Sequence, residues 1–245
     1  MEKKIAIVTG ASSGMGREFV RQLNKCTKTL EEVWVIARRE ELLLAIKEEG
    51  YYFRVRAIAL DLCQEAVLNV LSEYLVVENP SVRILVNAAG MGRAGRFDEL
   101  TRQEVENMVQ LNDKTLAVVT HMVLPYMAKP GNIIQLASAS AFLPQKEFAV
   151  YSASKAFVLS FSRALHAEVK KQGITVTAVC PGPVDTEFLQ LSNRGREQKL
   201  LKRLVTVKPK PVVKKALRDT GAGKEISIYG LPMKMVAAAA KLLPM

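Results

Sequence analysis

The stretch KIAIVTGASSGMGREF, residues 4–19, joins a short apolar run to a turn with three glycines and then to the start of a helical pattern. Its first part is rich in β-branched and other apolar residues at successive positions, which predicts a strand buried on both faces. Gly10, Gly14 and Gly16 follow at the point where this strand ends. Glycines permit a tight turn and a close backbone approach to a bound group, and the unpaired N–H groups of a helix N-terminus favour an anion. The stretch therefore predicts a strand–turn–helix unit that binds the pyrophosphate of a dinucleotide.

Similar apolar runs recur along the chain and are separated by segments of helical length. They are EVWVIAR (32–38), FRVRAIALD (53–61), RILVNAAG (83–90), NIIQLAS (132–138) and ITVTAVCPG (174–182), with a weaker seventh run, EISIYG (225–230). Alternating strands and helices imply right-handed crossovers and a parallel sheet. We expect an α/β protein, with a single doubly wound domain over residues 1–245 and a mostly parallel seven-stranded sheet whose last strand lies at an edge.

The composition, with 49% hydrophobic and 24% charged residues, is typical of a globular protein. MEKKIAIVTG leads from charged residues directly into a strand, so we expect no signal peptide and a cytoplasmic location. Cys26, Cys63 and Cys180 are widely spaced and are predicted to be small buried side chains. His121 and His166 have no carboxylate or cysteine at ligand spacing, so no metal site is expected.

The net charge of +11 is concentrated near the C-terminus, where residues 194–245 hold 13 lysines and arginines against three acidic residues. A solvated basic face explains this excess, and an anionic substrate, an acidic partner or a membrane surface are the alternatives. Apart from Tyr229 the basic quarter lacks interleaved aromatic residues, so a nucleic-acid partner is not expected.

Arg38 and Arg39 follow the second predicted strand, where a site for NAD(H) would carry an acidic residue to accept the ribose hydroxyl. A guanidinium suits a phosphate, so the pair favours NADP(H). The alternative is two solvent-facing arginines that open the next helix. Asp61, after the third predicted strand, is placed to bond the adenine edge or to cap the helix that follows.

Tyr151 and Lys155 lie four residues apart in YSASK, on one face of a predicted helix. An ammonium beside a phenol is expected to lower the phenol pKa toward neutral pH. Ser138, at the end of the fifth predicted strand, could hydrogen-bond a substrate oxygen beside that phenol, which is general acid–base chemistry on a carbonyl or alcohol. The alternative is a half-buried aromatic residue and a lysine whose charged end reaches solvent.

Five stretches in this order resemble the short-chain dehydrogenase/reductase family over nearly the whole chain: TGASSGMG, NAAG, the serine at 138, YSASK and PGPVDT. The resemblance implies a Rossmann-type domain, with Tyr151 as the acid–base residue, Lys155 on the nicotinamide ribose and Ser138 on the substrate. It also implies that Asn112 bends a helix and holds a water in a proton relay. Ser13 and Arg38 resemble the NADP-preferring members, and Thr186 would contact the nicotinamide amide.

The positions expected at the cofactor are Gly10, Ser12, Ser13, Gly14, Met15, Gly16, Arg38, Arg39, Asp61, Leu62, Asn87, Ala88, Ala89, Gly90, Tyr151, Lys155, Pro181, Gly182, Val184 and Thr186. Two features depart from the family pattern or leave a choice open. The usual NNAG is NAAG here, so a side-chain contact at Ala88 is missing. Ser140 follows Ser138 closely, and the spacing to Tyr151 favours Ser138.

Two segments lie outside the repeating strand–helix pattern. Residues 183–211 form a long insertion after the sixth predicted strand, which is expected to cover the substrate, with a surface helical pair as the alternative. The basic and apolar extension 231–245 is too short to span a bilayer. We expect it to pack between subunits of a homodimer or homotetramer, with peripheral membrane contact as the less favoured interpretation.

These observations predict an NADP(H)-dependent oxidoreductase that acts on a small-molecule carbonyl or alcohol. The alternative is a dinucleotide-sensing or interaction protein on the same fold, with little catalysis. Residues 92–97, 141–148 and 188–201 are expected to form the substrate pocket, and their mixture of apolar and basic side chains indicates no particular compound.

Overall fold

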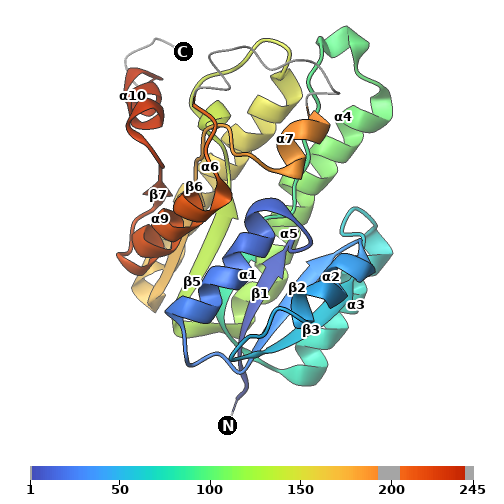
Figure 1. The fold of residues 1–245 in the computed structure, drawn as a ribbon, viewed down its shortest axis with the longest axis vertical. Helices are drawn as coiled ribbons and strands as arrows, with labels where there is room; N and C mark the ends of the chain where they lie inside the picture. Colours follow the sequence, from blue (N-terminus) through green and yellow to red (C-terminus); the bar gives the residue numbers. More distant parts are fainter. Residues whose placement is uncertain (1, 193–204, 241–245) are drawn as a thin grey trace.

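The computed structural model describes residues 2–192 and 205–240, which form one sheet of seven strands (Figure 1). The strands are β1 (Lys4–Thr9), β2 (Glu32–Ala37), β3 (Arg54–Ala59), β4 (Ser81–Asn87), β5 (Met127–Leu136), β6 (Ile174–Val179) and β7 (Ile226–Ser227). Their order in the sheet is β3-β2-β1-β4-β5-β6-β7, and every neighbouring pair is parallel. The predicted α/β fold with a seven-stranded sheet is confirmed.

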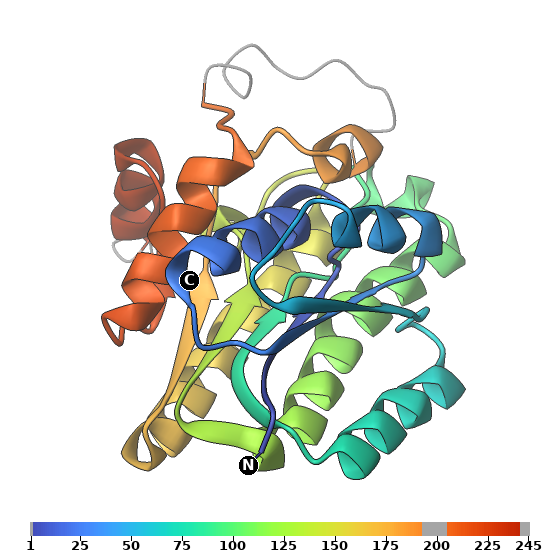
Figure 2. The same ribbon diagram turned by 60° about the horizontal axis from the view of Figure 1, so that its bottom comes forward.

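Helices cover both faces of the sheet, so the domain has three layers (Figure 2). One face packs against α1 (Gly14–Cys26), α2 (Glu40–Lys47) and α9 (Pro209–Gly221). The other packs against α3 (Glu65–Glu78), α5 (Leu116–Val123) and α6 (Ala149–Val169). A further helix, α4 (Arg102–Val109), runs into α5 through a π-helical turn, Gln110–Thr115.

The central strand β1 shows why its sequence is apolar at successive positions. Ala6 and Val8 are fully buried in the core beneath α1 and α9. Ile5 and Ile7 point the other way and are fully buried in the core beneath α3 and α5. Side chains alternate between the faces of a strand, so a strand covered on both sides has no polar face.

The last strand is shorter than its sequence suggested. Only Ile226 and Ser227 pair with β6, whereas the apolar run extends from 225 to 230. Gly230 has a φ of +84°, and the chain then enters α10 (Leu231–Ala240). The positive φ at Gly230 marks the turn into α10, and β7 is a two-residue strand at the edge of the sheet.

The strand order changes direction between β1 and β4, because the chain first adds β2 and β3 on one side and then β4 to β7 on the other. In open parallel sheets such a switch point marks the ligand crevice at the carboxyl ends of the strands. These ends face the upper part of Figure 1, where α7 (Glu187–Ser192) also lies.

Residues near the two ends of the long insertion after β6 lie side by side. Val184 and Val207 form a parallel β-bridge, and the Asp185 N–H donates to the Val207 carbonyl oxygen at 2.9 Å. Residues 193–204 of the predicted 183–211 cover, and residues 241–245 of the extension, lie outside the described residues. None of the described helices combines the length and apolar character needed to cross a membrane.

Candidate active site

A cleft of about 780 Å³ lies at the carboxyl edge of the sheet, beside the switch point. It is lined by the loops that follow the first six strands, by the start of α6, by α7 and by α10. Every predicted catalytic and cofactor-binding residue lines this cleft except Asn87 and Asn112, which lie behind its wall. Segments far apart in sequence therefore converge on one site of a size typical for ligand pockets.

The glycine turn after β1 brings two backbones into close contact. Gly10 has a φ of +64°, and a Cβ atom there would lie 2.6 Å from the Ala89 nitrogen. A Cβ atom on Gly16 would overlap the Gly10 carbonyl oxygen. Only glycine fits both positions, because the turn packs against the loop after β4 on one side and against the first turn of α1 on the other.

The N-terminus of α1 opens into the cleft beside this turn. Ser13 is its N-cap residue but makes no capping hydrogen bond with its side chain, and the first turn contains no acidic residue. The first N–H groups of a helix and its dipole favour an anion at this place. The turn can therefore accept a pyrophosphate.

The two arginines after β2 have different environments. Arg38 is exposed and forms no ion pair with any residue in the described part of the chain. Arg39 reaches over the glycine turn, where its Nη2 atom donates to the hydroxyls of Ser12 at 3.3 Å and Ser13 at 3.2 Å. Its guanidinium also makes two short bonds to the carboxylate of Glu187, at 2.6 and 2.7 Å. Of the two arginines, Arg39 is the one held at the glycine turn.

Asp61 and Leu62 lie in the loop that follows β3 and line the cleft. The Oδ1 atom of Asp61 accepts a hydrogen bond from the Cys63 N–H at 3.1 Å, whereas the N-cap residue of α3 is Gln64. The suggestion that Asp61 caps this helix is thus wrong, because a local turn separates it from the helix. Leu62 is buried, and its carbonyl oxygen accepts a bond from Thr115 at 2.8 Å.

Asn87 belongs to a buried polar network behind the cleft wall. Its Nδ2 atom donates to the Thr120 hydroxyl at 2.9 Å and to the Gln135 side-chain oxygen at 3.0 Å. The loop that follows is held instead by the Ala89 N–H, which donates to the Thr9 hydroxyl at 3.1 Å. These bonds join β4 to β1, β5 and α5, so the loop keeps its shape although Ala88 supplies no polar contact.

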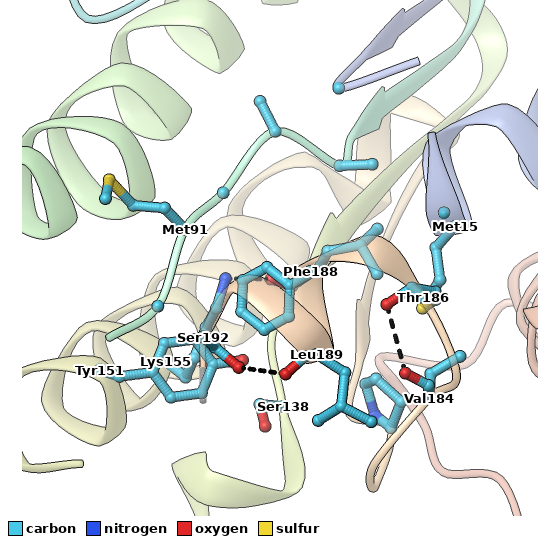
Figure 3. Close-up of a pocket in the computed structure, with 18 of the residues that line it drawn as sticks. Met15, Met91, Ser138, Tyr151, Lys155, Val184, Thr186, Phe188, Leu189 and Ser192 are labelled. Atoms are coloured by element: carbon cyan, nitrogen blue, oxygen red, sulfur yellow. Dashed lines mark hydrogen bonds between the residues drawn. The ribbon is translucent and has the colours of Figure 1, made fainter. Parts of the chain in front are cut away.

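Tyr151, Lys155 and Ser138 lie together in the cleft (Figure 3). The Nζ atom of Lys155 lies 5.7 Å from the centroid of the Tyr151 ring and donates to the Leu136 carbonyl oxygen at 2.8 Å. The Ser138 hydroxyl donates to the Ser140 hydroxyl at 3.2 Å, and it lies close enough to Tyr151 to lower the pKa of the phenol against the effect of burial. The start of α6 and the end of β5 thus meet to form one polar cluster.

Burial is the main cause of the pKa shifts of Tyr151 and Lys155. It raises the pKa of Tyr151 to about 12, and the Ser138 hydroxyl only partly opposes this rise. It lowers the pKa of Lys155 to about 8, against the effect of the Asp113 carboxylate. The lowered phenol pKa expected from Lys155 is therefore not found in this structure. A phenol that is protonated at neutral pH is suited to donate a proton rather than to accept one.

Asn112 lies in the π-helical turn between α4 and α5 and is fully buried. Its side chain accepts from the Met91 N–H at 2.9 Å, donates to the Met91 carbonyl oxygen at 2.8 Å and donates to the Ser154 hydroxyl at 3.0 Å. A Cβ atom on Gly90 would lie 3.1 Å from its Oδ1 atom and 3.5 Å from the Nζ atom of Lys155. Asn112 thus connects the loop after β4 to the helix that carries Lys155.

Ser138 and Ser140 both line the cleft, but their partners differ. The Ser138 hydroxyl accepts from the Ser140 N–H at 3.1 Å, donates to the Ser140 hydroxyl at 3.2 Å and lowers the pKa of the Tyr151 phenol. The Ser140 hydroxyl accepts from the Gln145 amide at 3.1 Å. Of the two serines, Ser138 has the geometry to act with Tyr151 on a substrate oxygen.

Apolar side chains surround the tyrosine. Phe148 packs edge-on against the Tyr151 ring with ring centroids 5.5 Å apart. Phe188 of α7 approaches the same ring with a centroid distance of 5.8 Å (Figure 3). Leu143 and Leu189 line the same region. Tyr151 and Lys155 are both buried, so charges on these two groups interact more strongly than they would in water.

Residues of α10 complete the apolar wall. Met233 packs against Gly182, where a Cβ atom would lie 2.6 Å from its sulfur, and Val236 also lines the cleft. Leu231 and Met235 of the same helix are exposed. One face of the C-terminal extension therefore belongs to the pocket. The sequence analysis placed residues 183–211 over the cleft, but it predicted neither the contact of Glu187 with Arg39 nor the place of α10 in the wall, because both depend on contacts between distant segments.

The residues present fit a dinucleotide, since the close approach at Gly10, the N-terminus of α1 and the guanidinium of Arg39 face one continuous cleft. Within residues 2–192 and 205–240, no group of three or more His, Cys, Asp or Glu side chains could hold a metal ion. His166 is buried, with its Nδ1 atom 2.9 Å from the Val176 carbonyl oxygen.

Comparison with known proteins gives a consistent result. The family model described as short chain dehydrogenase matches residues 4–197. Sulfoacetaldehyde reductase 2 of Chromohalobacter salexigens is 33% identical over 196 residues, which are 78% of this chain and 77% of that protein. A short-chain dehydrogenase from Sphingobium yanoikuyae, solved with NADPH, has a TM-score of 0.83 at 25% identity and covers 98% of this chain and 94% of its own. A short-chain dehydrogenase/reductase from Burkholderia phymatum, solved with NAD, shares the fold with a TM-score of 0.80 at 19% identity, over 98% of this chain and 92% of its own.

Proposed function

The chain belongs to the short-chain dehydrogenase/reductase family of oxidoreductases, and we propose that it is an NADP(H)-dependent enzyme that interconverts a carbonyl and an alcohol. The observation that carries this proposal is the cluster of Tyr151, Lys155 and Ser138, which faces the same cleft as the glycine turn. A bound nicotinamide would supply or accept the hydride. The chain's own residues would bind and orient the substrate and move the proton.

In the direction of reduction, Tyr151 would donate its phenolic proton to the carbonyl oxygen. Its raised pKa supports this role, because the proton is present at neutral pH. Ser138 would orient the same oxygen through its hydroxyl. Lys155, with a pKa of about 8, is mostly charged at pH 7 and would stabilise the phenolate as it forms.

Asn112 would act as a positioning residue in this reaction. It holds the backbone of Met91 and the hydroxyl of Ser154, one residue before Lys155. This arrangement supports the role in a proton relay that the family resemblance implies.

The preference for NADP(H) rests on Arg39 and Ser13, with Arg38 nearby at the rim. Guanidinium and hydroxyl donors at the glycine turn suit a ribose 2′-phosphate. The similar structure solved with NADPH supports this choice, whereas the fold is also solved with NAD, so the fold by itself does not decide the cofactor.

We propose that the substrate carries an apolar substituent, because Phe148 and Phe188 pack against Tyr151, and Leu143 and Met233 line the same cleft. Such a pocket gains affinity by removing apolar surface from water. The small anionic substrate in the name of the Chromohalobacter relative is the contrasting case.

The segment 183–211 would cover the bound substrate, since Phe188, Leu189 and Leu191 line the cleft from α7. The exposed Leu231 and Met235 support self-association through the outer face of α10, although its inner face belongs to the pocket. A homodimer or homotetramer in the cytoplasm is the arrangement we propose.

A panel of ketones and aldehydes tests the function. It should include alkyl and aryl ketones and, as a contrast, small aldehydes with a sulfonate or carboxylate group. NADPH oxidation is followed by absorbance, with the Tyr151→Phe variant as the blank. We expect turnover of apolar carbonyls with NADPH. Tight NADPH binding with no turnover of any compound would instead favour the dinucleotide-sensing alternative.

A further inference from the structure

Glu187 and Arg39 form an ion pair between segments that are 148 residues apart in the sequence. The two carboxylate oxygens lie 2.6 and 2.7 Å from the Nη1 and Nη2 atoms of the guanidinium. The Ser13 hydroxyl lies beside the same carboxylate and helps to lower the pKa of Glu187. The carboxylate of Glu187 thus occupies the donors of the glycine turn that we assign to a 2′-phosphate.

We propose that Glu187 is a specificity-determining residue whose carboxylate competes with the cofactor 2′-phosphate for Arg39 and Ser13. This inference rests on the proposed NADP(H)-dependent function. It adds that Glu187 lowers the preference of the enzyme for NADP(H) over NAD(H). The 2′-phosphate must displace the carboxylate before it can bind the same donors. A cofactor with a free ribose hydroxyl needs no such exchange, and its hydroxyl can donate to the carboxylate.

The ion pair of Arg39 and Glu187 has good hydrogen-bond geometry, but it is partly exposed to solvent, so a phosphate can replace the carboxylate. Its bidentate form is the preferred geometry for guanidinium and carboxylate. The side chains are 40% and 38% exposed for Arg39 and Glu187, so solvent screens the pair and its net stabilisation is small. Arg39 also lowers the pKa of the Glu187 carboxyl, so the competing group is charged at neutral pH.

Only the side chain of Glu187 has to move in this exchange. The far end of α7 is held independently, because the Ala94 N–H donates to the Ser192 carbonyl oxygen at 2.8 Å. Arg93 also donates to the Leu191 carbonyl oxygen at 2.6 Å. The helix can therefore keep its place, and Phe188 its contact with Tyr151, while the carboxylate rotates away from Arg39.

The test compares wild type with Glu187→Gln, which keeps the size of the side chain and removes its charge. Adenosine 2′,5′-bisphosphate and 5′-AMP are titrated into the full chain by calorimetry at fixed low ionic strength, and NADP⁺ and NAD⁺ follow. We expect the variant to bind the two 2′-phosphorylated ligands about tenfold more tightly, since it loses both a competitor and a repulsive charge. The affinities for 5′-AMP and NAD⁺ should change by less than about twofold.

Two controls separate competition from a general effect of charge. Glu41 is an exposed carboxylate that acts on Arg39 at a distance, so Glu41→Gln should change these affinities much less. In an Arg39→Met background, Glu187→Gln should have a clearly smaller effect than in wild type, because no guanidinium is left to compete for.

The outcomes distinguish this inference from the proposed function. If wild type prefers adenosine 2′,5′-bisphosphate to 5′-AMP but Glu187→Gln leaves both affinities unchanged, the NADP(H) site stands and the competition is refuted. Equal tightening for both ligands also refutes it, since the carboxylate would then obstruct any adenosine. If wild type binds adenosine 2′,5′-bisphosphate no more tightly than 5′-AMP, and NADP⁺ no more tightly than NAD⁺, the proposed cofactor preference is refuted, and this inference is refuted with it.

Discussion

Arg39 and Lys155 are cations in the same cleft, but their surroundings differ. The side chain of Arg39 is 40% exposed. It forms an ion pair with Glu187 and donates hydrogen bonds to the hydroxyls of Ser12 and Ser13. Lys155 is 4% exposed, and burial moves its pKa to about 8. We call these regions the phosphate end and the catalytic end. Solvent screens charges at the first and is largely excluded from the second, so an interaction of the same kind has a smaller effect at the phosphate end.

This comparison predicts the largest effect for the proton donor at the catalytic end. Tyr151→Phe should reduce kcat at least about a hundredfold, because it removes the acid but keeps the ring between Phe148 and Phe188. The Kd for NADPH should change by less than about twofold, as measured by calorimetry. Tyr74→Phe, which removes a phenol on α3 outside the cleft, is the matched control. Activity retained in Tyr151→Phe would refute the mechanism.

At the phosphate end the next largest effect should come from Arg39. Arg39→Ala should reduce the ratio of kcat/KM for NADPH over NADH by about ten- to a hundredfold, as expected for the loss of a charged hydrogen bond. Arg38→Ala should reduce it by no more than about threefold, because its side chain is exposed and has no ion-pair partner among the described residues. Both variants are measured at one ionic strength. A larger effect of Arg38→Ala would show that the wrong arginine was assigned to the phosphate.

The pH dependence of binding should differ between the two ends. The pKa of Lys155 is lowered to about 8, so its positive charge is lost as the pH rises through that value. NADPH should therefore bind about tenfold more weakly at pH 9 than at pH 7, if the charged form is required. Adenosine 2′,5′-bisphosphate binds only at the phosphate end, where Arg39 stays charged, and its affinity should be constant over this range. Parallel pH profiles for the two ligands would contradict a separate role for Lys155.

The smallest predicted effect concerns the apolar wall. Phe188→Ala should raise KM for a bulky apolar ketone about three- to tenfold, because the substrate loses part of its apolar contact. The Kd for adenosine 2′,5′-bisphosphate should stay the same. Phe157→Ala removes an exposed ring on α6 outside the cleft and serves as the control. An equal loss of affinity at both ends would mean that Phe188 supports the structure of the cleft rather than the substrate.

Much of the site could be predicted from short stretches of sequence. The glycine turn, the pair Tyr151 and Lys155, and the polar position at Ser138 each belong to one local element whose end is visible in the sequence. The carboxyl ends of parallel strands must meet at one edge, so these elements could also be expected to converge. The spacing to Tyr151 already favoured Ser138 over Ser140, and in the structure Ser138 is the serine that lowers the pKa of the Tyr151 phenol, whereas Ser140 accepts from Gln145.

Other features depend on contacts between distant segments. The sequence offers no reason to pair Glu187 with Arg39, or to place Met233 against Gly182. Burial also reversed one expectation, since the pKa of Tyr151 is raised although Lys155 lies one helical turn away. The burial of a side chain depends on all the elements packed around it, so the resulting pKa shift cannot be predicted from a local sequence pattern.

The sequence by itself determined the alternation of strands and helices, the doubly wound order and the residue types at the strand ends. The periodicity of apolar residues, the backbone freedom of glycine and the four-residue spacing on a helix are local properties, so they do not depend on contacts between distant segments. Tertiary structure alone decided which arginine lies over the glycine turn, which carboxylate occupies its guanidinium and how far each buried group is shifted in pKa. Those properties depend on distances and solvent exclusion, which exist only once segments from both ends of the chain have packed around one cleft.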